Sequence, residues 1–423
     1  MNKHSKNGML VIGGCQAAVQ FAVSLRDLGY AEPITMVSDE HHLPYQRPPL
    51  SKGYLSGDVT EDALIYRSAE FYVEHNIDVR LGERIVRIER NEAGGGEAVS
   101  QTGDSFAFDR VALAVGAAPR RLALDGADAS GVLYLRDAHD AAELRDRLGA
   151  AERVVIIGGG FIGLEAAESA RTLGKHVTVI EVAPRLIGRA VGLETSAFFL
   201  KATRRRGIEV LLSAQLDRIA VREDGRVSGV VLRDGTVLGA DIVVIGVGVV
   251  PRVELALELG LAVDNGIVVD EFSVASDGST IAVGDCANLP NPYPKDPLLP
   301  RIRLESVNNA MEQSISAAKT VMGFGEPYHT VPWFWSDQAD LKLQIAGLSS
   351  GYDTVITRGD PEEEKVSFFY FAQGELIAAD CVNSPAEFAI TRNALRSGRK
   401  LDQADAARTD VPFKTLIREA QPL

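Results

Sequence analysis

The chain has 423 residues, of which 46% are hydrophobic and 24% charged, and its formal net charge is −14. This length predicts two to three domains with a large buried core, and the negative charge argues against binding nucleic acid or an anionic membrane through the overall field. No apolar run reaches the roughly 18 residues of a membrane span. The short apolar run at 9–12 is broken at once by two glycines, which favours a buried strand over a signal peptide, so we expect a cytoplasmic protein.

Residues 9–40 have the order strand, glycine turn, helix and strand that begins a dinucleotide-binding unit. The turn consists of Gly13, Gly14, Cys15, Gln16, Ala17 and Ala18. In the G-x-G-x-x-G pattern, Cys15 occupies the place of the second glycine, and Ala18, a tolerated variant, that of the third. We interpret Cys15 as a small side chain that fits with slight adjustment. The alternative is weakened or displaced cofactor binding at this turn.

The three cysteines of the chain are Cys15, Cys286 and Cys381, and no two of them form a C-x-x-C or another close pair. This spacing argues against a disulfide framework, and also against a metal or iron–sulfur cluster held by this chain. A redox dithiol is therefore not expected among its electron carriers.

The same order of elements returns at residues 153–181, where the turn is an uninterrupted G-x-G-x-x-G. Gly158 permits the tight turn, Gly160 lets the backbone approach a pyrophosphate, and Gly163 lets helix and strand pack closely. The helix expected from about residue 164 to 173 would present amide groups and a partial positive charge to the phosphates. Glu181, at the end of the next strand, is expected to accept hydrogen bonds from ribose hydroxyls and to repel a 2′-phosphate, which favours NADH over NADPH.

Four later stretches make the interpretation more specific. They are residues 42–52 (HLPYQRPPLSK), 279–287 (STIAVGDCA), 303–310 (RLESVNNA) and 331–338 (VPWFWSDQ). Together with the two turns, they resemble the FAD-dependent ferredoxin reductases of bacterial oxygenase systems, from residue 9 to about residue 347. The resemblance implies an enzyme that passes a hydride from NADH to FAD and then single electrons to a [2Fe–2S] ferredoxin, which feeds a Rieske dioxygenase or a cytochrome P450.

Carried onto matching positions, the resemblance implies two sets of cofactor-binding residues and no metal site. The FAD set, with the first glycine turn, is Gly13, Gly14, Cys15, Ala17, Ala18, Asp39, Arg47, Lys52, Ile85, Gly116, Arg136, Asp285 and Val307. The NADH set, with the second turn, is Gly158, Gly160, Ile162, Gly163, Glu181, Arg189 and Gly248. A helix N-cap is a second interpretation of Asp285.

Three residues are candidates for the catalytic machinery: Lys52, Glu165 and Trp335. Lys52 is a compact cation suited to the N5 edge of the flavin, and Glu165 is a candidate ion-pair partner for it across the domain interface; the alternative is a surface salt bridge of little energy. Trp335 would lie beside the flavin where electrons leave, and the alternative is that both tryptophans are core residues. The helix that begins at Val307 would stabilise the anionic N1–C2 edge of reduced flavin with its N-terminus.

Matching strand ends near residues 114 and 245 predict that one nucleotide domain is inserted into the other. We expect an α/β fold with two Rossmann-like, glutathione-reductase-like domains, an FAD-binding domain at 8–116 and 251–329 and an NADH-binding domain at 117–250. Residues 330–423, with a strand at 368–371 and a helix at 385–397, would form a small α/β C-terminal domain.

Two other functions remain open at this stage. One is reduction of a small molecule, as in monodehydroascorbate reductases, and the other is NADH sensing without steady turnover, as in apoptosis-inducing factor. No cysteine follows the first helix, which disfavours a disulfide reductase or an NADH peroxidase. An acidic ferredoxin would need a local basic patch on this acidic chain, and the alternative for each patch is an ordinary solvated surface. The candidate patches are Arg301 with Arg303, and Arg392 with Arg396, Arg399 and Lys400.

Overall fold

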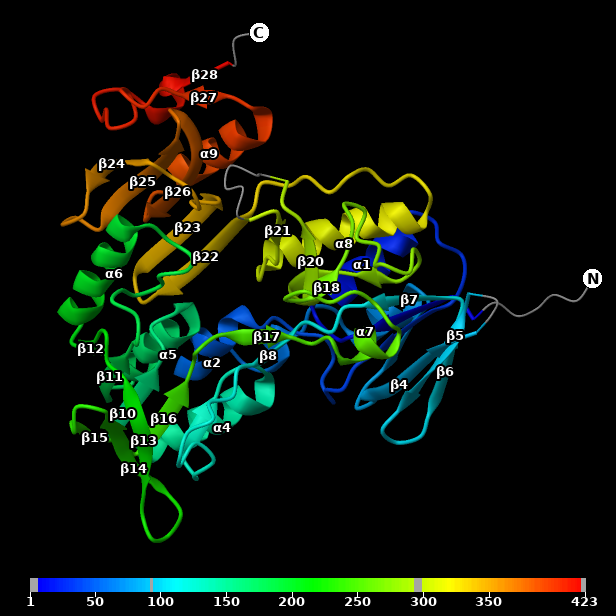
Figure 1. Cartoon of the computed structure of the whole chain (residues 1–423), viewed down its shortest axis with the longest axis horizontal. Coiled ribbons are helices and arrows are strands. Elements are labelled where there is room, and N and C mark those ends of the chain that lie inside the picture. The colour runs from blue at the N-terminus through cyan, green and yellow to red at the C-terminus, as the bar shows by residue number, and fades with distance from the viewer. Residues whose placement is uncertain (1–6, 92–93, 293–298, 420–423) are drawn as a thin grey trace, which may run out of the picture. The chain divides into compact units, whose positions relative to one another are not determined.

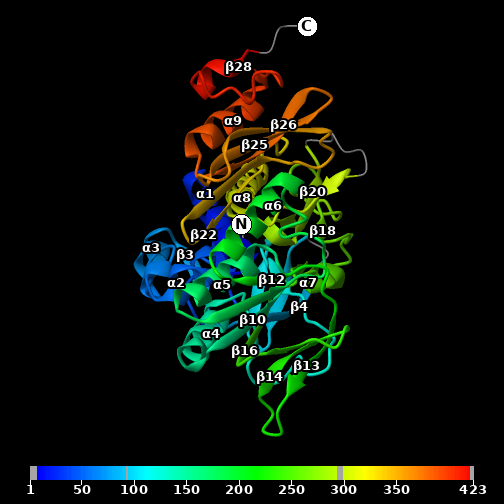
Figure 2. The same ribbon diagram turned by 90° about the vertical axis from the view of Figure 1, so that its left-hand side faces the viewer.

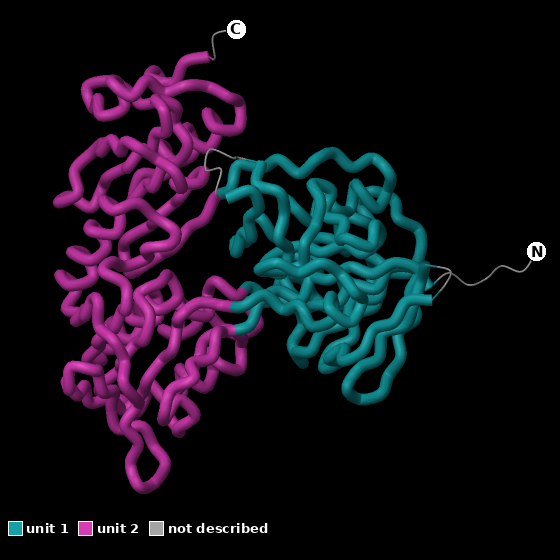
Figure 3. The backbone as a smooth tube through the Cα atoms, in the orientation of Figure 1, with its two compact units in different colours: residues 1–46, 64–118, 250–332 teal, residues 47–63, 119–249, 333–423 magenta. Residues whose placement is uncertain are grey.

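The fold is described from a computed structural model for residues 7–91, 94–292 and 299–419. The chain forms two compact units, coloured teal and magenta in Figure 3. Unit 1 contains residues 1–46, 64–118 and 250–332, and unit 2 contains residues 47–63, 119–249 and 333–423. None of the helices within the described ranges has the length and apolar character needed to cross a membrane.

Unit 1 is built around a parallel sheet with the strand order β19-β7-β1-β2-β3. Its strands are β1 (Met9–Ile12), β2 (Ile34–Val37), β3 (Ile77–Arg80), β7 (Arg110–Leu113) and β19 (Ile281–Ala282). All of β1 is buried, as expected for a central parallel strand covered on both faces. Met9 and Val11 pack on one face against helices α1 (Gln16–Asp27) and α8 (Val307–Val321), which lie side by side in Figure 1.

The other face of this sheet, with Leu10 and Ile12, packs against short strands and a short helix. These elements are β4 (Ile85–Arg90), β5 (Gly96–Ser100), β6 (Ser105–Phe108), α7 (Glu254–Glu258), β18 (Ile267–Val268), β20 (Ala287–Pro290) and β21 (Arg301–Ile302). Helix α3 (Ala69–Glu74) precedes β3, and η3 (Gly284–Cys286) follows β19. Strands β8 (Ala117–Pro119) and β17 (Val249–Pro251) contain points at which the chain passes between the two units.

Unit 2 contains a second parallel sheet, with the order β12-β11-β10-β16-β9. Its strands are β9 (Val132–Tyr134), β10 (Arg153–Ile157), β11 (His176–Ile180), β12 (Glu209–Leu211) and β16 (Ile242–Ile245). The helices of this region are α4 (Ala138–Ala150), α5 (Phe161–Thr172) and α6 (Leu193–Arg205). One face of this parallel sheet packs against an antiparallel sheet of β13 (Leu216–Val221), β14 (Val227–Leu232) and β15 (Val237–Gly239). The β13–β14 hairpin extends beyond the rest of the unit in Figure 2.

Residues 333–419 form an antiparallel sheet in the order β22-β23-β26-β25-β24. Its strands are β22 (Trp333–Gln338), β23 (Leu341–Gly347), β24 (Thr354–Asp360), β25 (Lys365–Ala372) and β26 (Glu375–Val382). Helix α9 (Pro385–Ser397), which has the predicted bounds, covers one face through Phe388, and η4 (Phe413–Leu416), β27 (Lys400–Leu401) and β28 (Ile417–Arg418) complete this face. The α/β fold predicted from the sequence is confirmed.

The compact units group the chain differently from the three domains predicted above, and those boundaries remain a prediction. One apolar core in unit 2 contains Phe199 of α6 together with Leu343 and Phe368 of the C-terminal sheet, so these two regions share buried surface. Residues 47–63, predicted to belong with FAD, also join unit 2, where Leu55 enters the same core. Their short helices are η1 (Pro48–Ser51), α2 (Gly53–Ser56) and η2 (Asp62–Leu64).

Asp380 on β26 is a fully buried carboxylate, and its Oδ2 accepts a 2.7 Å hydrogen bond from the Tyr370 hydroxyl. Burial raises the pKa of Asp380 to about 6. An unfolded aspartate has a pKa of about 4, so the folded chain takes up a proton as the pH falls through about 6, before the unfolded chain does. The raised pKa of Asp380 therefore lowers the free energy of unfolding at pH 7, and this cost fades as the pH approaches about 4.

Asp380→Asn should remove this titration while keeping an acceptor for Tyr370. We expect the free energy of unfolding of the native chain, minus that of the variant, to rise by about 2 kcal/mol as the pH is lowered from about 7.5 to about 4.5. Urea unfolding of both proteins across this range measures the difference. A difference that does not change with pH would contradict the assignment of a raised pKa to Asp380.

Candidate functional site

Two of the three pattern glycines in the second turn, Gly158 and Gly163, are required by the conformation and packing of the chain itself. Gly158 has φ +113°, and a Cβ placed on Gly163 would lie 2.1 Å from the Gly158 carbonyl oxygen. Gly160 is different, because its φ is −82° and a Cβ placed there would meet no atom within 4 Å. The chain itself gives no steric reason for a glycine at 160. Close approach of a ligand to the backbone supplies that reason and fits the predicted pyrophosphate site.

The start of α5 is also suited to an anion. Gly160 is the N-cap residue, and no side chain accepts a hydrogen bond from the first amide groups of the helix there. The first turn of a helix carries a partial positive charge, so these amides can bind a phosphate. The helix begins at Phe161, three residues before the predicted start, because the glycine turn leads directly into it.

Glu181 follows β11 and lies beneath this turn. Its Oε2 accepts a hydrogen bond from the Gly159 amide at 2.7 Å, and its Oε1 accepts one from the Ala183 amide at 2.8 Å. The carboxylate is therefore held in a fixed orientation by the backbone on both sides. Each oxygen has a further lone pair, so a ribose hydroxyl can still donate to Glu181, and that role remains a prediction.

Other residues of the predicted NADH set lie near the carboxyl end of the same sheet. Ile162 is 45% exposed although it is a large apolar residue in the first turn of α5. Gly248 has φ +95°, and a Cβ placed on it would lie 2.9 Å from a terminal nitrogen of Arg189. The structure thus brings Arg189 beside Gly248, as expected for two residues along one ligand.

The first glycine turn accommodates Cys15 without disruption. Gly13 has φ +131°, and its Cβ would lie 2.2 Å from the Ala114 carbonyl oxygen, so a glycine is required there. The Cys15 Sγ donates to that same carbonyl oxygen at 3.1 Å. Ala18, at the third glycine position, is fully buried. The side chain of Cys15 therefore fits the turn, and the effect of Cys15 on FAD binding remains untested.

The rest of the predicted FAD set is divided between the two units. In unit 1, Asp39 forms an ion pair with Arg252 at 3.4 Å, and Ile85 begins β4. Asp285 lies in η3, as the middle residue of that turn and not as a helix N-cap. Gly116, with φ +64°, and Val307, the first residue of α8, complete this group. In unit 2, the guanidinium of Arg47 donates to the Arg136 carbonyl oxygen at 2.9 Å, and Lys52 follows η1.

The predicted ion pair between Lys52 and Glu165 is present, with Nζ and Oε2 2.7 Å apart, and both residues belong to unit 2. Glu165 is only 3% exposed, so this is not a surface salt bridge. Two hydroxyl groups also donate to its carboxylate, Ser51 at 2.5 Å and Ser336 at 2.6 Å. Neither serine was among the predicted site residues, although Ser51 directly precedes Lys52.

Trp335 lies in an aromatic group on β22. Its ring centroid is 5.4 Å from that of Trp333, and Trp333 also contacts Phe388 of α9. The guanidinium of Arg392 lies over the Trp333 ring at 5.1 Å. Trp333 therefore packs as a core residue, while the position of Trp335 beside a flavin remains a prediction.

One of the two predicted basic patches is occupied by internal contacts. The Arg303 side chain is 9% exposed, and its guanidinium binds the Asp285 carbonyl oxygen at 3.1 Å and the Glu305 carboxylate at 2.6 Å. Arg301 donates to two backbone carbonyl groups, those of Val269 and Asn288. Arg396 in α9 and Arg399 and Lys400 just after it are exposed, although Arg399 pairs with Glu419 and Lys400 with Glu375. Because these cations face solvent, the second patch is the better candidate for docking.

Comparisons with known proteins agree with this geometry. The model of the family "Pyridine nucleotide-disulphide oxidoreductase" matches residues 8–314, and that of "Reductase C-terminal" matches residues 333–417. Rhodocoxin reductase from Rhodococcus erythropolis is 41% identical over 409 residues, which cover 97% of this chain and 94% of that protein.

Two solved structures are similar over nearly the whole chain, each with a TM-score of 0.92. One is the ferredoxin reductase for the CYP199A2 system from Rhodopseudomonas palustris, 38% identical and covering 97% of this chain and 99% of that one. The other is a covalent putidaredoxin reductase–putidaredoxin complex, 34% identical and covering 98% of each chain. The chain therefore belongs to the pyridine nucleotide-disulphide oxidoreductase family, whose members use FAD and NAD(H), and carries a reductase C-terminal domain.

Proposed function

We propose that this protein is an NADH-dependent ferredoxin reductase that contains FAD. In this proposal it takes a hydride from NADH and delivers single electrons to a [2Fe–2S] ferredoxin that feeds a Rieske dioxygenase or a cytochrome P450. Relatives with similar sequence and structure over almost the full length serve such systems by name. The cytoplasm is the proposed location.

The observation that carries the proposal is a pair of dinucleotide turns without a sulfur relay. Cys286 and Cys381 are fully buried, and burial raises the pKa of Cys286 to about 12 and also raises the pKa of Cys381. Only the thiolate is reactive, so the burial of both sulfurs disfavours disulfide exchange, and the Sγ of the third cysteine, Cys15, donates to the Ala114 carbonyl oxygen. In this proposal electrons leave the flavin directly, which suits an acceptor that takes one electron at a time.

The residues have distinct tasks in this mechanism. The two glycine turns and the starts of α1 and α5 would hold the pyrophosphates of the two dinucleotides. Glu165, fixed by two serines, holds the ammonium group of Lys52 in place. The start of α8, capped by Ser306 through the Asn309 amide at 3.1 Å, offers a partial positive charge to an anionic ring edge. FAD, when bound, supplies both hydride acceptance and one-electron release.

A panel of acceptors tests the proposal. The purified yellow protein should oxidise NADH steadily with at least one [2Fe–2S] ferredoxin, and it should do so faster than with a rubredoxin, monodehydroascorbate or cytochrome c alone. NADH consumption and acceptor reduction are followed together under anaerobic conditions. Fast turnover with monodehydroascorbate alone would instead support a small-molecule reductase, and a long-lived reduced complex with every acceptor would support an NADH sensor.

Salt dependence is a further expected result for the same reaction. If the exposed cations at the end of α9 dock an acidic ferredoxin, the second-order rate constant should fall as ionic strength rises, because screening weakens long-range attraction. Arg396→Ala should reduce this salt dependence without altering flavin reduction by NADH. Arg218→Ala, on an exposed arginine of β13 in the same unit, is a matched control and should leave both rates unchanged.

A further inference from the structure

We propose that the C-terminal sheet positions the NADH-binding loop through the hydroxyl group of Tyr370. The loop comprises residues 182–192, between Glu181 and α6, and carries Arg189, a candidate NADH ligand. The inference therefore rests on the proposed function. It concerns contacts within unit 2 only.

The loop is tied to the second glycine turn at its centre. The Ile187 amide donates to the Gly159 carbonyl oxygen at 2.9 Å, and Ile187 has φ +52°, an unusual conformation for a β-branched residue. A Cβ placed on Gly159 would lie 2.5 Å from a methyl group of Leu186. Ser196 in the first turn of α6 donates to the Leu186 carbonyl oxygen at 2.7 Å. A shift of the start of α6 would therefore be passed to the glycine turn.

The start of α6 is held in turn by Tyr370 on β25. The Tyr370 hydroxyl accepts a hydrogen bond from the Gly192 amide at 3.2 Å and lies 2.9 Å from the Thr195 hydroxyl. It donates to Asp380 at 2.7 Å, and both Tyr370 and Asp380 are fully buried. The Tyr370 hydroxyl therefore connects β25 and β26 to the last residue of the loop and to the first turn of α6.

The surroundings of Gly192 show that the end of the loop packs closely against the C-terminal sheet. Its φ of −69° is ordinary, so its backbone conformation does not require glycine. A Cβ at this position would lie 2.3 Å from a carbon of the Tyr370 ring. The glycine is needed because the Tyr370 ring occupies the space where a side chain would be.

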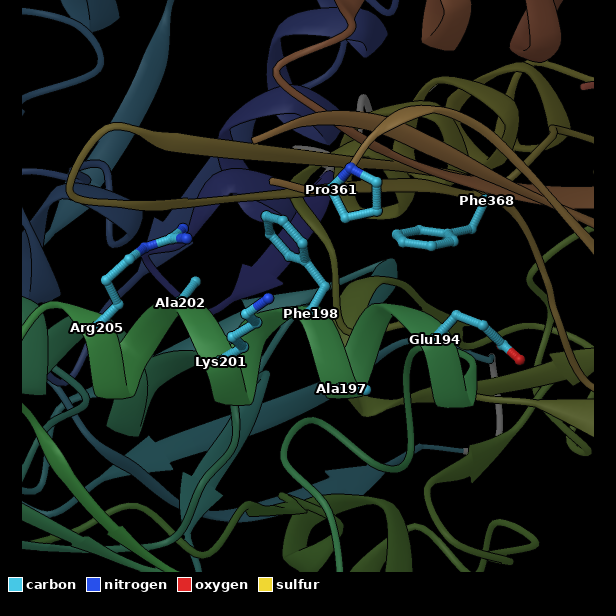
Figure 4. Close-up of a pocket in the computed structure, with 8 residues that line it drawn as sticks. All are labelled: Glu194, Ala197, Phe198, Lys201, Ala202, Arg205, Pro361 and Phe368. Carbon is cyan, nitrogen blue, oxygen red and sulfur yellow. The ribbon is translucent and has the colours of Figure 1, made fainter. Parts of the chain in front are cut away.

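The rest of the contact between α6 and the C-terminal sheet is made by apolar packing and by ion pairs. A pocket of about 290 Å³ lies between α6 and the residues Pro361 and Phe368. In Figure 4 the side chain of Phe198 points from α6 toward Pro361 and Phe368. Farther along the helix, Lys201 pairs with Glu362, and Arg205 pairs with Glu364. The Lys201 pair is exposed and contributes little free energy, whereas Glu364 is mostly buried and also binds Arg206 at 3.0 Å. These ion pairs lie toward the end of α6, and at its start the Tyr370 hydroxyl supplies the hydrogen bonds to the C-terminal sheet.

Tyr370→Phe removes the hydroxyl group and keeps the ring. We expect the Kd for NAD⁺, measured by calorimetry on the oxidised holoenzyme, to rise about two- to tenfold, the change that corresponds to the loss of about one buried hydrogen bond. The KM for NADH should rise with it, because the loop must then be ordered on binding. The flavin spectrum and the rate of flavin reduction at saturating NADH should remain those of the native protein.

Tyr352→Phe is the matched control, because it also removes a tyrosine hydroxyl. The Tyr352 ring packs edge-to-face against the Tyr370 ring, with the two ring centroids 4.9 Å apart. It should leave the Kd for NAD⁺ unchanged. Thr195→Val removes one partner of the Tyr370 hydroxyl and should raise the Kd in the same direction, so the inference can be tested even if Tyr370→Phe does not fold. An unchanged Kd in both Tyr370→Phe and Thr195→Val, with or without loss of thermal stability, would overturn the inference. Failure of the native protein to bind NAD⁺ or to be reduced by NADH would instead refute the proposed function.

Discussion

Gly160→Val is expected to leave the fold intact and to abolish efficient reduction of the flavin by NADH. No atom lies within 4 Å of a Cβ placed on Gly160, and its backbone conformation is open to any residue. The new side chain would occupy the space at the start of α5 that we assign to the NADH pyrophosphate. Because a displaced dinucleotide also misplaces its nicotinamide ring, we expect kcat/KM for NADH to fall about 100-fold or more.

Stopped-flow measurement of flavin bleaching by NADH, together with thermal unfolding, tests this expectation. Gly149→Val is the matched control, because Gly149 near the end of α4 is equally open and does not belong to either glycine turn. Gly163→Val should behave in the opposite way, since its Cβ would lie 2.1 Å from the Gly158 carbonyl oxygen and the variant should lose stability. A Gly160→Val protein that is reduced at the native rate would show that NADH does not bind at this turn.

Lys52→Met should slow flavin reduction about 100- to 1000-fold at saturating NADH, the range seen when a preorganised charge near a reacting group is removed. Methionine keeps most of the length of lysine and removes its charge. Glu165 would lose its ionic partner while retaining the bonds from Ser51 and Ser336. The measured quantity is the limiting rate constant of flavin bleaching, with FAD content determined for each variant.

Glu165→Gln separates the two roles of the pair. It removes the buried negative charge, and its amide oxygen can accept a hydrogen bond from one serine while its NH2 group donates to the hydroxyl of the other. Because Lys52 keeps its charge, we expect a smaller loss of rate than in Lys52→Met. Lys414→Met, on an exposed lysine near the C-terminus, controls for a general loss of positive charge. If Lys52→Met bleached its flavin as fast as the native protein, Lys52 would have no place in hydride transfer.

The glycine turns could be predicted because their glycines recur at a short, fixed spacing between strand and helix. The contact of Gly163 with Gly158 lies within that spacing, whereas the contact of Gly158 with Gly246 joins distant parts of the sequence and leaves no such pattern. The bounds of α9 were correct for a similar reason, since proline begins that helix and glycine follows it. The start of α5 was placed too late because the apolar pattern was read without its cap residue.

Other features depend on residues that are far apart in the sequence. Gly192 and Tyr370 are separated by 178 positions, and no periodic pattern connects them. The two serines around Glu165 likewise come from segments 114 and 171 positions away. Arg303 has the character of a surface cation, yet its guanidinium is enclosed because a backbone carbonyl and Glu305 lie within reach. Tertiary contacts of this kind can be found only once the chain is folded.

Each compact unit is formed by three separate segments of the chain, and this has a consequence for biosynthesis and for protein engineering. The chain changes unit after residues 46, 63, 118, 249 and 332. A ribosome must therefore release the chain through residue 332 before unit 1 has all of its parts, and unit 2 also needs residues 333–423. Truncation at any single peptide bond would leave at least one unit incomplete, so chimaeras that exchange acceptor preference between relatives need matched swaps of several segments.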